Sequence, residues 1–158
     1  MMELSFKIGN RTERVNVPAE NLLGVLEPNA VKADLAGEAA VRRALAEPIG
    51  TPRLRDIVRP GEKIAIVTSD ITRPMPTWTV MPALLEELYA AGAAPEDITL
   101  VFALGSHRGH TEAEKAHLAG ERAWREITCV DLNVEDCVHV GVTSRGTPVD
   151  IDRRVAEA

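Results

Sequence analysis

The chain has 158 residues, 45% of them hydrophobic, and a formal net charge of -6. This length and apolar content suffice for one domain with a substantial core, so we predict a single domain over residues 1–158. The acidic balance argues against a nucleic-acid partner, because binding a phosphate backbone requires a concentrated basic face.

No run approaches the ~20 apolar residues of a membrane helix, and the first residues lack the basic-then-apolar order of a signal peptide. We therefore expect no membrane partner and a cytoplasmic location. Cys129 and Cys137 have flanks typical of strand edges. We expect reduced thiols there, in neither a disulfide nor a metal site.

The first elements in chain order are a predicted hairpin and a predicted helix. Residues 4–7 and 14–17 alternate apolar and polar side chains around Gly9-Asn10, which predicts a β-hairpin. Asp34 then offers an N-cap for a helix that Pro48 and Gly50 end. Residues 54–58 add another helical turn.

A buried strand, a helix and a second strand follow. Residues 63–67 form a near-continuous β-branched run, typical of a strand covered on both faces. Residues 76–91 predict a helix that Gly92 ends, and residues 97–104 repeat the buried-strand pattern. The predicted helix carries an apolar stripe at Val80, Leu84, Leu85 and Leu88.

The last elements are a short helix, a third strand and a second hairpin. Thr111 and Glu114 have the spacing of a capping box, which predicts a helix through Leu118. Residues 124–130 predict a third strand. Two further strands, at residues 138–142 and 147–151, flank a turn at Ser144-Arg145-Gly146.

These elements predict an α/β fold, a Rossmann-like three-layer core with a parallel sheet, plus an N-terminal and a C-terminal β-hairpin. A strand–helix–strand crossover makes its two strands parallel, so the loops after both strands emerge at one edge of the sheet. Open parallel sheets place their chemistry in such loops. We therefore expect Arg73 and His107 to share a site.

The loop after the first buried strand holds Asp70, Thr72, Arg73 and Pro74. The planar guanidinium of Arg73 suits a carboxylate or a phosphate, which predicts an anion site. The alternative is a structural pair between Asp70 and Arg73, with Thr72 as a turn or cap residue.

The loop after the second buried strand holds His107, the best acid or base in the chain. The alternative is a hydrogen bond from His107 to a backbone carbonyl. His110 is either an additional polar contact or a part of the cap around Thr111. His117 follows His110 at helical spacing, but its charged neighbours are typical of a solvated face, so we expect no metal site there.

Two loop segments, Ser69-Asp70-Ile71-Thr72-Arg73-Pro74 and Gly105-Ser106-His107-Arg108, together with the helix that carries Glu114, resemble the amino-terminal part of the lactate racemase family. Residues 141–149 are similar to that family's Gly-x-Thr-x-x-Gly-Thr-Pro-Val segment. The order and spacing match, and the resemblance runs from about Leu22 to the last residue.

The resemblance implies racemisation or epimerisation of a 2-hydroxy acid by proton-coupled hydride transfer. The cofactor that it implies is a nickel-pincer nucleotide, Ni(II)-pyridinium-3,5-bisthiocarboxylate mononucleotide. It implies that Asp70, Ile71, Thr72 and Arg73 contact this cofactor and that Arg73 also holds the substrate carboxylate. His107 matches one of the family's two catalytic histidines.

The family's second catalytic histidine, its cofactor-attaching lysine and its nickel-ligand histidine all lie beyond the position that matches Ala158. No metal ligand is therefore expected in this chain. We expect the amino-terminal part of a longer enzyme, inactive alone and without bound cofactor. One alternative is a non-catalytic module that binds a small carboxylate or a nucleotide; another is one half of a split enzyme whose second half is separately encoded.

Overall fold

The structure is a computed structural model that describes all of residues 1–158, and it divides into two compact units, residues 1–34 and residues 35–158. No helix in it is both long and apolar enough to cross a membrane. The assignment of residues 1–158 to one domain stays a prediction.

The first unit is a hairpin followed by an extended segment. Strands β1 (Met2–Ile8) and β2 (Arg11–Val17) pair antiparallel, as predicted, and Gly9 adopts a φ of 59° at the turn. A 3-10 turn, η1 (Ala19–Asn21), follows. Met2, Leu4, Phe6 and Ile8 alternate with polar residues, so one face of β1 is apolar.

The second unit begins with two helices, α1 (Gly37–Ala46) and α2 (Leu54–Ile57). The expectation that Asp34 caps the first helix is wrong. Ala36 occupies the N-cap and no side chain caps the helix. Asp34 lies two residues too early for its carboxylate to reach the first free amides of the helix.

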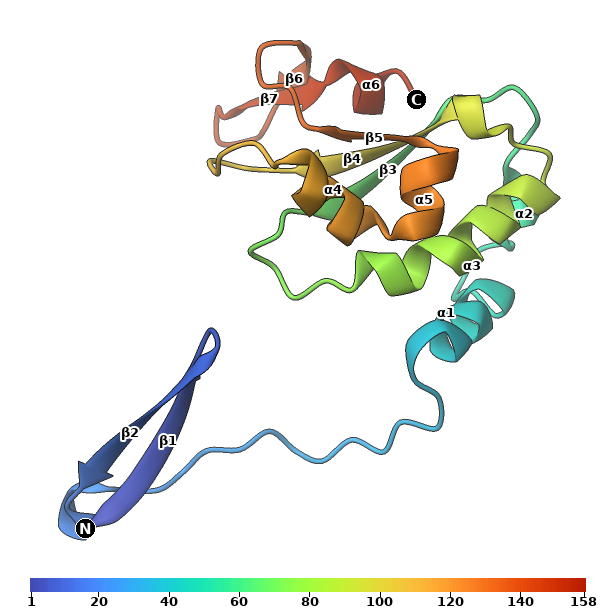
Figure 1. The fold of residues 1–158 in the computed structure, drawn as a ribbon. Coiled ribbons are helices and arrows are strands. Elements are labelled where there is room, and N and C mark those ends of the chain that lie inside the picture. Colours follow the sequence, from blue (N-terminus) through green and yellow to red (C-terminus); the bar gives the residue numbers. More distant parts are fainter. The chain divides into compact units, whose positions relative to one another are not determined.

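A parallel sheet of three strands in the order β3-β4-β5 forms the centre of the second unit (Figure 1). Its strands are β3 (Ile64–Ser69), β4 (Ile98–Ala103) and β5 (Thr128–Asp131). Ile64 pairs with Ile98 and Thr99 with Thr128, so all three strands run in the same direction. The predicted parallel sheet is thereby confirmed.

Helices cover one face of this sheet (Figure 1). They are α3 (Thr77–Ala90), α4 (Glu112–Ala119) and α5 (Glu121–Glu126). Alternate residues of β4, Ile98, Leu100 and Phe102, are fully buried against them. Leu85 and Leu88 of the predicted apolar stripe are buried, which confirms that part of it. Val80 and Leu84 are only partly buried, and Met81 enters the core instead.

Glycines end two of these helices. After α3, Gly92 adopts a φ of 90°, its N–H donates to the Tyr89 carbonyl, and the Ala93 N–H donates to the Leu88 carbonyl. This Schellman ending confirms the predicted helix end and turns the chain, through η2 (Pro95–Asp97), into β4. Gly120, with a φ of 80°, separates α4 from α5, where a Cβ would lie 3.0 Å from the Cβ of Trp78.

The prediction of a strand over residues 124–130 is wrong in its first half, because residues up to Glu126 belong to α5. Ala123 and Ile127 are four residues apart and both are buried in the core, which fits a helix ending on the sheet. The strand begins only at Thr128.

The other face of the sheet is covered by a hairpin and a short helix (Figure 1). They are β6 (Cys137–Val142), β7 (Pro148–Asp152) and α6 (Arg153–Ala156), and the hairpin confirms its prediction. Helix α6 packs against β3. The expectation that β3 is covered on both faces is wrong at Val67, whose residue surface is 53% exposed, because this end of the sheet opens into a cavity.

Candidate active site

An open cavity of about 860 Å³ lies at the carboxyl ends of β3 and β4. Ser69 and Ala103, which occupy partner positions at the ends of the two strands, both line it. The loops after the strands contribute Asp70, Arg73 and His107. The parallel pairing therefore brings the two predicted loops to one cavity, as the sequence suggested.

Asp70 is the anchor of this site, and only 4% of its surface is exposed. Its Oδ1 accepts from the Thr72 hydroxyl at 2.8 Å and from the Thr72 N–H at 3.3 Å. Burial opposes the ionisation of Asp70, but the hydrogen bonds from Thr72 and His107 outweigh it and hold the pKa of the carboxyl below its ordinary value. Asp70 is therefore a carboxylate at neutral pH.

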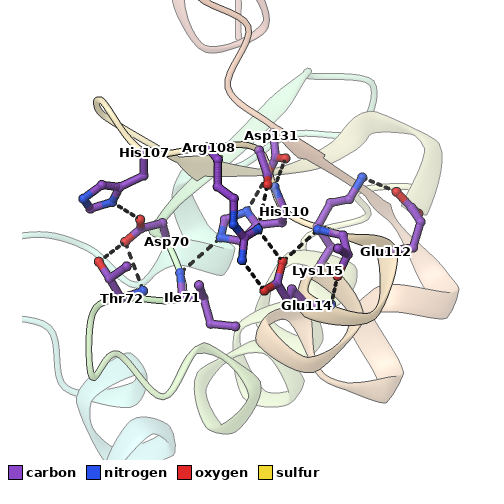
Figure 2. A network of polar contacts seen from close by, with 12 residues as sticks. Asp70, Ile71, Thr72, His107, Arg108, His110, Glu112, Glu114, Lys115 and Asp131 are labelled. Atoms are coloured by element: carbon purple, nitrogen blue, oxygen red, sulfur yellow. Dashed lines mark hydrogen bonds and ion pairs between the residues drawn. The ribbon is translucent and has the colours of Figure 1, made fainter. Parts of the chain in front are cut away.

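His107 contacts Asp70 through Nδ1, and 46% of its side chain remains exposed (Figure 2). Because a carboxylate can only accept, Nδ1 carries the proton and donates it to Asp70 Oδ2. Nε2 then keeps a free lone pair on the other side of the ring. The alternative of a His107 bond to a backbone carbonyl is wrong, since its partner is a carboxylate.

Arg73 lies in the same turn, and its side chain is solvent-exposed at the cavity. Its N–H donates to the Asp70 carbonyl at 3.1 Å, but its guanidinium makes no ion pair or hydrogen bond. The alternative of a structural Asp70–Arg73 side-chain pair is therefore wrong. A free guanidinium beside a cavity is available to an external carboxylate or phosphate.

A second aspartate–histidine pair lies beside the first, and only half of it was anticipated. His110 Nδ1 lies 2.6 Å from Asp131 Oδ1, the His110 N–H donates to Asp131 Oδ2 at 2.8 Å, and His110 Nε2 accepts from the Ile71 N–H at 3.1 Å (Figure 2). Asp131 ends β5, so the rule that carboxyl ends of parallel strands share an edge was the signal that could have found it.

The predicted capping box is confirmed in the same loop. The Thr111 hydroxyl accepts from the Glu114 N–H at 3.3 Å, and the Glu114 carboxylate accepts from the Thr111 N–H at 2.8 Å. Arg108 donates twice to Glu114, and this hydrogen bonding lowers the pKa of Glu114 to about 2. His110 takes no part in the cap, so its role as an additional polar contact is the correct alternative.

The remaining histidines do not join the site. His117 stacks on Trp78 at 5.3 Å between ring centroids, and His139 pairs with Asp150 on the surface of the second hairpin. No group of three or more His, Cys, Asp or Glu side chains is placed to hold a metal ion. Burial raises the pKa of the Cys129 thiol to about 11, so this sulfur stays protonated.

A family profile described as Lactate racemase N-terminal domain matches residues 8–158. The chain is 31% identical to the lactate racemase of Thermoanaerobacterium thermosaccharolyticum over 163 aligned positions, which cover 100% of this chain and 38% of that protein. It is 28% identical to the lactate racemase of Lactiplantibacillus plantarum, again over 100% of this chain and 38% of the relative.

The fold is similar to the solved structure of the lactate racemase apoprotein from Thermoanaerobacterium thermosaccharolyticum. The TM-score is 0.75 at 30% sequence identity, and the match covers 99% of this chain and 37% of that one. The chain therefore spans well under half the length of these relatives.

Proposed function

The chain belongs to the lactate racemase N-terminal domain family, and on this premise we propose that it supplies one wall of a site that racemises or epimerises a 2-hydroxy acid. The observation that carries the proposal is the Asp70–His107 pair, which shares an open cavity with the unpaired guanidinium of Arg73. These groups match the two polar ends of such a substrate.

The substrate carboxylate binds Arg73 in this proposal. A guanidinium presents a planar fork of donors that holds a carboxylate through two hydrogen bonds, and no internal carboxylate competes for it. The Arg73 N–H donates to the Asp70 carbonyl, and this hydrogen bond fixes the backbone from which the Arg73 side chain extends. Binding then orients the neighbouring C–OH group toward the rest of the cavity.

His107 is the acid–base group of this wall. Its free Nε2 takes the hydroxyl proton as the alcohol becomes a carbonyl, and returns that proton when the alcohol re-forms. The ionised Asp70 holds the Nδ1–H tautomer and stabilises the imidazolium that results. Inversion requires the hydrogen to return to C2 from the opposite face. A second base is then needed to exchange the hydroxyl proton of the other enantiomer.

The cavity fits the anionic and polar groups of a nickel-pincer nucleotide. Of the predicted contacts, Asp70 and Arg73 line the cavity together with Ser69 and Ser106, and these residues would hold the nucleotide in a volume of mononucleotide size. Ile71 and Thr72, also predicted to contact it, belong to the same turn but lie outside the lining. When bound, this cofactor supplies the electrophile that accepts the C2 hydrogen as hydride. No nickel ligand is proposed from this chain.

The same proposal limits what the chain does alone. Because it spans 38% of its relatives, we propose that it is inactive without the remaining polypeptide, joined to it or separately encoded. We place the reaction in the cytoplasm, where free thiols such as Cys129 and Cys137 persist.

Two measurements test this function. Isothermal titration of the chain with L-lactate and with a nucleoside monophosphate should give heat that Arg73→Ala abolishes and Arg145→Ala keeps, since Arg145 is an exposed arginine of the second hairpin. Absence of heat with the native chain would contradict the anion site.

The second measurement uses a chimera in which this chain replaces the matching 38% of the Thermoanaerobacterium thermosaccharolyticum lactate racemase. With cofactor, the chimera should interconvert D- and L-lactate, whereas the chain alone should not. Turnover by the chain alone would overturn the half-site assignment. Binding without turnover by the chimera would favour a non-catalytic carboxylate-binding module.

A further inference from the structure

We propose that His110 is a positioning residue, which fixes the turn after β3 and through it the Asp70–His107 pair. The proposal rests on the proposed function, because the placement of Asp70 matters to catalysis only if that pair handles the substrate proton. Its test reads the pair directly in the chain without substrate, so its failure is distinguishable from a failure of the proposed function.

His110 joins the carboxyl ends of all three strands. It belongs to the loop after β4, bonds Asp131 at the end of β5 and accepts from Ile71 after β3 (Figure 2). Its side chain is 1% exposed, and its ring lies edge-on to Phe102 at 5.5 Å between centroids. The ring is therefore held on several sides inside the protein.

The hydrogen bonds also fix where the proton of His110 lies. The Ile71 N–H can only donate, so Nε2 of His110 must be the accepting, unprotonated nitrogen. Nδ1 then carries the hydrogen and donates it to Asp131. Because both ring nitrogens are occupied and the ring is buried, His110 is excluded as a base toward substrate.

The hydrogen bond from the Ile71 N–H to His110 holds one peptide group, the one between Asp70 and Ile71. Its N–H is held by His110 Nε2 at 3.1 Å, and its carbonyl is held by the Arg73 N–H, also at 3.1 Å. This peptide group is therefore fixed at both ends. Its orientation sets the backbone from which the Asp70 carboxylate reaches His107 and from which the Arg73 side chain leaves.

Two substitutions at His110 separate its two contacts. In His110→Asn, an amide nitrogen near the Nδ1 position keeps the donor to Asp131 but leaves the Ile71 N–H without an acceptor. In His110→Gln, the amide oxygen reaches the Nε2 position and keeps the acceptor for Ile71. Both variants lose the aromatic ring and its contact with Phe102, which makes them matched for packing.

The readouts are the amide exchange rate of Ile71 and the ¹⁵N NMR signal of His107 Nδ1. In His110→Asn, the Ile71 amide should exchange about 2- to 10-fold faster, as expected for loss of one neutral hydrogen bond, and the His107 Nδ1–H signal should broaden or disappear. His110→Gln should retain both signals although its melting temperature also falls. Equal effects of the two variants on His107, or none, would overturn the proposal.

A third variant keeps the proposal testable if the first two fail to fold. Asp131→Asn keeps the His110 ring, and its amide oxygen still accepts from Nδ1, while the His110 N–H loses its acceptor. The hydrogen bond from the Ile71 N–H to His110 Nε2 and the His107 Nδ1–H signal should therefore persist. Loss of the His107 signal in Asp131→Asn with the Ile71 amide still protected would contradict transmission through the Asp70–Ile71 peptide.

Discussion

The two aspartate–histidine pairs at the end of the sheet have the same chemical parts and different surroundings. His107 keeps 46% of its side chain exposed and one ring nitrogen free, whereas His110 is 1% exposed and has both nitrogens bonded. Exposure and a free lone pair are what a proton-transfer group needs. The difference teaches that a neighbouring carboxylate alone does not identify a catalytic histidine.

The largest expected effect is loss of activity on removal of His107. In the chimera, His107→Ala should slow lactate interconversion about 10²- to 10⁴-fold, the usual contribution of an acid–base group. Its melting temperature should fall only moderately, because Asp70 loses the donor to Oδ2 but still accepts from Thr72 at Oδ1. His139→Ala, which removes another histidine paired to an aspartate, is the control and should retain activity. Full activity of His107→Ala would contradict the assignment of proton transfer to the exposed Asp70–His107 pair.

Acid should weaken the fold through carboxylates outside the histidine pairs. Glu87, Glu114 and Asp152 each have a folded pKa of about 2, chiefly because arginines hydrogen-bond to them. Since these values lie below those of the unfolded chain, their stabilisation is complete above about pH 4.5 and is lost as the pH falls toward 2.

Unfolding near pH 3 should therefore take up between about two and three protons at these positions, which urea unfolding measured at several pH values determines. Glu114→Gln should reduce the uptake by about one proton. An unchanged uptake in this variant would assign the acid sensitivity to other groups, the Asp70–His107 pair included.

Removal of His110 should cost more stability than removal of His107. His110→Ala leaves Asp131 Oδ1 and the Ile71 N–H without a partner, although the backbone N–H of residue 110 still donates to Asp131 Oδ2, so the free energy of unfolding should fall by about 2–3 kcal/mol. Urea denaturation of both alanine variants provides the comparison. Equal losses would mean that the buried pair contributes no more to folding than the exposed one.

The smallest effect concerns the helix cap next to His110. Thr111→Ala removes the side-chain acceptor of the capping box, which should lower the free energy of unfolding by about 1 kcal/mol. The NMR signals of the His110 ring should not change, because the ring takes no part in the cap. A changed His110 tautomer in this variant would show that the capping box and the His110 ring depend on each other.

The sheet and its loops were predictable because their signals are local. Continuous apolar runs predicted β3 and β4, and the Thr111–Glu114 spacing predicted the cap of α4. Parallel strands then placed Asp70, Arg73 and His107 at one edge. The first half of the third predicted strand failed because residues before Thr128 pack as a helix on the core, a tertiary preference that a short apolar run does not reveal.

The partners within the site were not predictable from spacing. Asp70 is three residues from Arg73 and 37 from His107, yet its carboxylate bonds the distant histidine. The Asp131–His110 contact joins the ends of two strands whose register the sequence does not specify. These contacts depend on how the strand ends align in space, and only the folded structure supplies that alignment.

The central claim is that the exposed pair meets the substrate and the buried pair does not. Titration of the ¹⁵N-labelled chain with L-lactate, observed at the histidine ring nitrogens, tests it most directly. Lactate should shift His107 Nε2, leave both nitrogens of His110 unchanged and have no effect on His107 in Arg73→Ala. A shift at His110 with His107 unchanged would contradict the account.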